Sequence, residues 1–217
     1  IWNTVDTSLI IFLILNFGQT LGDLWYPLAA VFIAVTYKFF FEYKGRPIIN
    51  PTVFALLLLM SIVGLVPGAQ PAFVSWWGAS FAEPLAASLL LIWVLTGLRV
   101  WKKWPIFLSF VIPYAIFTYF YGGMDFTNFV FTTGTVYFLA SVMLVEPKTS
   151  PATARNQIVA GVFTAIVYSA LLYFKVGASA LIAIAAMNLL NFIMSRAGNV
   201  PAPSAMPTRL KLTDPKN

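Results

Sequence analysis

The chain has 217 residues, of which 60% are hydrophobic and only 9% are charged, with a formal net charge of +6. Soluble domains carry about 25% charged residues, so this composition excludes a soluble globular protein. Because cysteine and histidine are absent, disulfides, thiolate or imidazole metal sites and the commonest general base are also excluded. We therefore predict an all-α membrane protein without a metal site, in which any redox chemistry needs an organic carrier.

Apolar runs along the chain predict a polytopic helical bundle of about eight spans, since a helix needs about 20 residues to cross a bilayer. The candidate spans are residues 4–18, 25–41, 51–67, 84–98, 105–121, 127–145, 157–174 and 179–195. The first run starts almost at Ile1, without an initiator methionine or a signal-peptide pattern, so we expect a processed or incomplete chain. Residues 1–197 form the predicted transmembrane domain, and residues 198–217 an extended polar cytoplasmic tail.

The basic residues mark one face of this predicted bundle. Every Lys and Arg except Lys175 falls in or beside the loops of the same side or in the C-terminal tail. The positive-inside rule assigns that side to the cytoplasm, so both termini are expected there, in a bacterial-type cytoplasmic membrane. The net positive charge is thereby explained without a nucleic-acid partner.

Two polar turns on this basic side are the centre of the prediction. Residues 42–52 and 145–151 both combine a glutamate, a lysine, prolines and hydroxyl groups directly after an apolar run. Proline ends a helix, and polar groups at the end of a span either face water or build a site. The pairs Glu42 and Glu146, Lys44 and Lys148, and Pro47 and Pro151 are each separated by 104 residues, which suggests an internal repeat with a site at its interface.

The segment from Val66 to Pro84 is too apolar for an open loop and too rich in proline and glycine for a span. One interpretation is an interfacial loop with Trp76 and Trp77 in the aromatic belt. The other is a re-entrant segment that lines a site, because irregular backbone at membrane depth survives only where protein or a cavity covers it. Glu83 is either a solvated turn residue or a proton-handling acid.

Asn50, directly before Pro51, has two interpretations. Asparagine followed by proline is typical of a helix N-cap, whereas Arg46, Asn50 and Thr52 could together present donors to a polar ligand at that helix start. Thr132 and Thr133 either bond to their own backbone and neighbouring helices or leave room for a flat ring. Asn188 and Asn191, three residues apart, are expected to join helices or to line a pathway.

Three segments, in order along the chain, resemble one family of membrane subunits, which occur in the Rnf electron-transport complex and in the sodium-translocating NADH:quinone oxidoreductase. They are Arg46-Pro-Ile-Ile-Asn-Pro51, Trp77-Gly-Ala-Ser80 with Pro84-Leu-Ala86, and Glu146-Pro-Lys-Thr-Ser-Pro151. The resemblance implies a urea-transporter-like helical fold, bound flavin, and partner subunits that deliver and accept electrons. In the family a threonine carries FMN covalently; this chain has Ser80 at that position, so we expect FMN or riboflavin to be bound non-covalently.

The resemblance thus predicts a flavin-holding membrane subunit of an electron-transfer complex, with no soluble-type catalytic residues of its own. The residues expected to hold or support the cofactor are Arg46, Asn50, Trp77, Gly78, Ser80, Thr132, Thr133, Thr149 and Ser150. Two alternatives stay open: a redox-silent transporter or channel for a small polar solute, and a scaffold subunit that only packs within a larger membrane complex.

Overall fold

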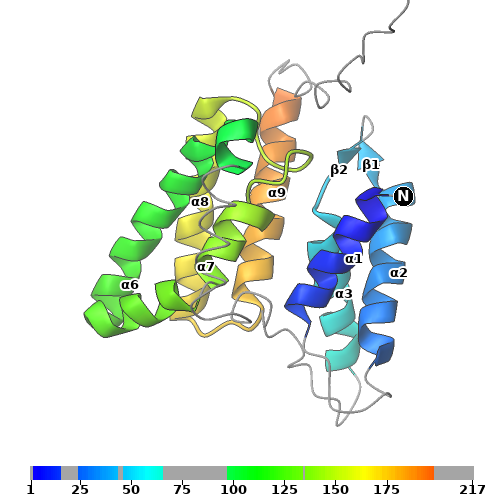
Figure 1. The fold of residues 1–217 in the computed structure, drawn as a ribbon, viewed down its shortest axis with the longest axis horizontal. Coiled ribbons are helices and arrows are strands. Elements are labelled where there is room, and N and C mark those ends of the chain that lie inside the picture. Colours follow the sequence, from blue (N-terminus) through cyan, green and yellow to red (C-terminus); the bar gives the residue numbers. More distant parts are fainter. Residues whose placement is uncertain (1, 16–23, 44–45, 66–96, 134, 198–217) are drawn as a thin grey trace, which may run out of the picture.

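The computed structural model describes residues 2–15, 24–43, 46–65, 97–133 and 135–197. These residues are mainly helical, and the helices form two bundles that lie side by side (Figure 1). The all-α prediction is confirmed, apart from a hairpin of two-residue strands. The predicted tail 198–217, the segment 66–84 and most of the fourth span, 84–98, lie outside the described residues.

The first bundle contains the helices α1 (Trp2–Ile14), α2 (Trp25–Phe40) and α3 (Pro51–Gly64). Strands β1 (Glu42–Tyr43) and β2 (Arg46–Pro47) pair antiparallel between α2 and α3. Helix α3 begins where the prolines predict, because Pro51 has no backbone N–H to satisfy and suits the first helical turn.

The second bundle contains α6 (Trp104–Thr132), α7 (Thr135–Phe138), the π-helix η2 (Leu139–Met143), α8 (Ala154–Tyr173) and α9 (Ser179–Ala197). Gly123 interrupts α6 with a φ of 74° and a ψ of −172°, at the predicted turn between the fifth and sixth spans. Glycine suits this position because it lacks the Cβ that disfavours positive φ. The predicted single span 127–145 is therefore divided among the end of α6, α7 and η2.

Three of the described helices are long and apolar enough to cross a membrane: Trp104–Thr132, Ala154–Tyr173 and Ser179–Arg196. The helices of the first bundle are apolar but shorter, with the stretches Val5–Ile14, Trp25–Phe40 and Pro51–Gly64. The lengths and composition support a membrane protein. A count of eight spans remains a prediction.

Helix α8 turns its small and polar side chains inward and its large aliphatic ones outward. Its buried residues follow helical spacing and are Gln157, Ala160, Gly161, Thr164, Ala165, Tyr168 and Ser169. Ile158, Val162 and Ile166 are exposed on the opposite face. This pattern is the one expected in lipid, where small residues allow helices to approach closely and apolar residues can face the bilayer.

Helix α9 connects the bundles, since it packs against α8 on one side and α3 on the other. The hairpin between α2 and α3 and the turn between η2 and α8 lie at the same end of the molecule (Figure 1). The prediction that the two polar turns share one face is therefore confirmed, and the two turns contact each other at this end.

Candidate functional site

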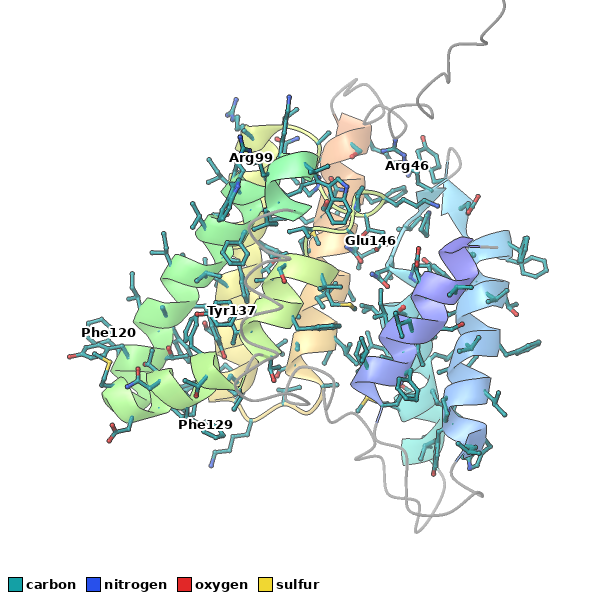
Figure 2. All side chains as sticks on the ribbon, viewed as in Figure 1. Arg46, Arg99, Phe120, Phe129, Tyr137 and Glu146 are labelled. Carbon is teal, nitrogen blue, oxygen red and sulfur yellow. The ribbon has the colours of Figure 1, made fainter. Side chains whose placement is uncertain are left out.

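A cluster of buried and half-buried polar side chains lies where the two bundles meet. Its members come from the start of α3, the turn before α8 and the inner face of α9; they are Asn50, Glu146, Thr149, Asn188 and Asn191. We call these five residues the polar junction. Figure 2 shows Glu146 between the bundles, near the end that also carries Arg46 and Arg99, with Phe120 and Phe129 at the other end.

Asn50 is the central residue of the polar junction. Its Oδ1 accepts hydrogen bonds from the backbone N–H groups of Thr52 at 2.9 Å and Val53 at 3.3 Å, which makes Asn50 the predicted N-cap of α3. Its Nδ2 donates to Oε2 of Glu146 at 2.7 Å. Its backbone N–H donates to Oδ1 of Asn188 at 2.8 Å. One residue thus completes a helix start and binds two elements of the other bundle.

Glu146 is the acid of the polar junction. Its Oε2 accepts from Asn50 and from Oγ1 of Thr149 at 2.9 Å. Burial raises the pKa of the Glu146 carboxyl, against the opposing effects of the Thr149 and Asn50 hydrogen bonds and of the positive charges of Lys38 and Lys148. A partly buried acid between helix bundles is a position at which proton binding and packing are coupled.

Two amides of α9 fix the carbonyl of Thr149. Nδ2 of Asn191 donates to this oxygen at 2.8 Å and Nδ2 of Asn188 at 3.5 Å. The spacing of three residues places both amides on one face of α9. The interpretation of Asn188 and Asn191 as residues that join helices is therefore confirmed.

Lys103 holds the other end of the same turn. It is 5% exposed, and its Nζ donates to the carbonyl oxygen of Pro151 at 2.6 Å. Burial lowers the pKa of the Lys103 ammonium to about 8, and the positive charge of Arg46 acts in the same direction. The start of α6, the turn before α8 and β2 thus meet at this end of the molecule.

An aromatic contact continues the connection between the bundles beyond the polar junction. The guanidinium carbon of Arg196 lies 5.1 Å from the ring centre of Tyr43 and 5.0 Å from that of Phe192. The two rings meet edge to face at 5.3 Å. These distances are within the range of cation–π attraction, so the end of α9 is held against the hairpin.

The structure brings four of the nine predicted site residues to this end of the molecule. Asn50 and Thr149 belong to the polar junction, Ser150 donates from Oγ to the carbonyl oxygen of Glu146 at 2.7 Å, and Arg46 lies in β2. Trp77, Gly78 and Ser80 lie outside the described residues.

Thr132 and Thr133 do not join this group. They lie at the end of α6, separated from the turn before α8 by α7 and η2. Oγ1 of Thr132 donates to the carbonyl oxygen of Asn128 at 2.8 Å, and Oγ1 of Thr133 to that of Val130 at 3.0 Å. These bonds match the alternative in which threonines in a membrane helix bond back to their own backbone.

Among the described residues, those predicted to bind flavin are better suited to supporting the site than to contacting the flavin ring. The side chains of Asn50, Thr149 and Ser150 are already hydrogen-bonded within the junction and its turn. Arg46 and Lys148, at the same end, carry the charge that suits a phosphate group. The other predicted ring contacts, Thr132 and Thr133, bond to their own backbone, and residues 77–80 lie outside the described part of the chain.

The site prediction missed Lys103, Glu146 and the two asparagines of α9 as members of one site. Glu146 carried a signal, because an acid after a long apolar run is unusual. Asn188 and Asn191 also gave a signal, because their spacing of three residues places both on one face of a helix. Lys103 follows Lys102 in an ordinary basic loop, so no feature of the sequence separates the buried lysine from the exposed one.

The fold and site together define a helical membrane protein with a polar contact between two bundles. No protein-family model matches the chain, and no curated protein matches it either.

Proposed function

We propose that this chain is a membrane subunit of a flavin-dependent electron-transfer assembly, as the resemblance to the membrane subunits of the Rnf complex implies. One observation supports the proposal most directly. Two of the three segments that carry the resemblance, residues 46–51 and 146–151, meet in one hydrogen-bonded unit through Asn50 and Glu146. Segments that act together at one site are expected to meet in space although they are distant in sequence.

In this proposal the junction fixes the bundles, and the flavin lies against residues 77–80. The bound flavin would supply one- and two-electron chemistry, for which protein side chains alone have no equivalent. Arg46 and Lys148 place positive charge near the phosphate of FMN. Other subunits of the complex deliver and accept the electrons.

The test is a visible absorption spectrum of the purified chain, recorded before and after denaturation and desalting. Flavin absorption that is lost on denaturation supports a non-covalent electron carrier. Flavin that stays with the denatured chain points to a covalent bond at Ser80 or another hydroxyl. A folded protein without flavin, purified with riboflavin and FMN present, contradicts the proposal.

A second candidate function is transport of a small polar solute or a proton. The observation that favours it is the partly buried carboxyl of Glu146 at the contact between two helix bundles, with a raised pKa. Acids in such positions in membrane proteins commonly belong to ion or proton pathways. Proteoliposomes with an entrapped pH dye test it: flux in the wild type that Glu146→Gln abolishes supports transport, and equal flux in both variants contradicts a role for Glu146.

A further inference from the structure

A groove between α6 and α8 lies at a distance from the polar junction. It has a volume of about 400 Å³ and is lined almost wholly by apolar atoms. Helix α6 contributes Pro113 and Phe117, and α8 contributes residues of its last turns together with Phe174, which follows it. Both helices are long and apolar enough to cross the membrane. The groove therefore opens from a surface that faces lipid.

The shape of the groove follows from the residues that line it. Ala165, 1% exposed, and Ser169, 9% exposed, form its floor, because small side chains on α8 leave space opposite Pro113. Ile166 and Phe174 are 62% and 73% exposed and form its rim. An apolar groove with a wide-open side suits a flexible chain of methylene groups, which can enter laterally from the bilayer.

A lysine is the next residue in the chain after Phe174, the last residue that lines this groove. Lys175 follows Phe174 directly, is exposed, and has a φ of 54°, with its backbone N–H bonded to the carbonyl oxygen of Leu172 at 3.0 Å. Lys175 is also the one basic residue that the loop charges assign to the side opposite the polar turns. Among the described residues, Asp125 is the other charged residue that the predicted loops assign to the same side as Lys175.

We propose that this groove binds one phospholipid with an anionic headgroup, of the phosphatidylglycerol type. An acyl chain lies along Ala165, Ser169 and Ala170, and the phosphate contacts the ammonium of Lys175. The aromatic ring of Tyr173 lies at the level where tyrosine is enriched in membrane proteins, between the hydrocarbon and the headgroups. The charge of Lys175 selects the anionic headgroup, whereas the groove retains the acyl chain of the lipid. The proposal depends on the membrane location and not on flavin.

The test uses the whole purified chain in detergent with equal amounts of phosphatidylglycerol and phosphatidylcholine, and native mass spectrometry counts the retained lipid. We expect one phosphatidylglycerol per chain. Ala170→Trp fills the groove from an exposed position, which spares the fold, and reduces lipid retention at least about fivefold, because each buried methylene group contributes to binding. Lys175→Gln reduces the preference for phosphatidylglycerol over phosphatidylcholine about fivefold, with total retention kept.

Val159→Trp is the matched control, since Val159 is exposed on α8, about three turns from Ala170 on the same face and outside the groove. This variant is expected to retain lipid as the wild type does. Equal lipid retention in Ala170→Trp and the wild type, or an equal loss in Val159→Trp, overturns the proposal. A change from dimer to monomer in Ala170→Trp without a change in bound lipid also overturns it, because the groove then holds a second copy of the chain.

Discussion

Asn50 and Glu146 are 96 residues apart in the chain and are joined by a hydrogen bond of 2.7 Å between Nδ2 and Oε2. The same asparagine caps α3, so the start of one helix depends on the packing of the other bundle. Cap formation and bundle contact are therefore expected to be lost together.

We expect Asn50→Ala to lower the free energy of unfolding by about 2 kcal/mol, since a lost N-cap costs about 1 kcal/mol and a buried acceptor deprived of its donor costs a similar amount. Thermal unfolding in detergent measures the change. Asn50→Ser keeps a capping oxygen and removes the amide that donates to Glu146, so it separates the two effects. Ser61→Ala on the exposed face of α3 is the control and is expected to stay near the wild type. Equal stability of Asn50→Ala and Ser61→Ala would contradict the role of the junction.

Glu146→Gln is expected to change how stability depends on pH. Because burial raises the pKa of this carboxyl above its ordinary value of 4.5, the folded protein binds more protons than the unfolded chain above pH 4.5. The contribution of Glu146 to stability is fully present below pH 4.5 and is lost as pH rises through the raised pKa. The neutral amide of Gln removes this loss.

The measurement is the thermal midpoint from pH 4 to neutral pH, with Glu42→Gln as the control, because Glu42 is exposed in the hairpin. The Glu146→Gln variant should lose less stability over this range than the wild type, and the control should follow the wild type. Identical slopes in all three proteins would show that Glu146 titrates alike in the folded and unfolded states.

Lys103→Met is expected to remove a gain in stability at alkaline pH. Burial lowers the pKa of Lys103 to about 8 from its ordinary value of 10.5, so between these values the unfolded chain binds more protons than the folded protein. Because of Lys103, the free energy of unfolding of the wild type rises with pH across this range, and the variant lacks this rise. Lys102→Met is the matched control, because Lys102 is the exposed neighbour. If the two variants respond to pH in the same way, the interpretation of Lys103 is wrong.

Gly161→Ala tests the close contact between α6 and α8. A Cβ at this position would meet Oγ of Ser109 and would lie 2.6 Å from the carbonyl oxygen of Ile106, a backbone atom. Overpacking of this kind costs about 1–3 kcal/mol, so the thermal midpoint should fall. Gly64→Ala is the control within α3, where a Cβ meets nothing within 4 Å, and is expected to be neutral or stabilising. Similar midpoints for the two variants would argue against close helix packing at Gly161.

The sequence by itself determined the class of the protein, a membrane protein, and much of its local structure. Composition required a membrane, because too few charges exist to cover a soluble surface. The pair Asn50 and Pro51 predicted the start of α3, because capping and the missing proline N–H act within a few residues. Loop charges predicted that the two polar turns share an end.

Only the tertiary structure decided which polar residues act together. Asn188 and Glu146 reach Asn50 across 138 and 96 residues, distances at which no periodic pattern carries information. The burial of Lys103 and the exposure of Lys102 depend on where the turn before α8 lies, since local sequence is nearly the same for both. Contacts between distant segments arise from packing of whole helices, and helix packing is not encoded in any single stretch of the chain.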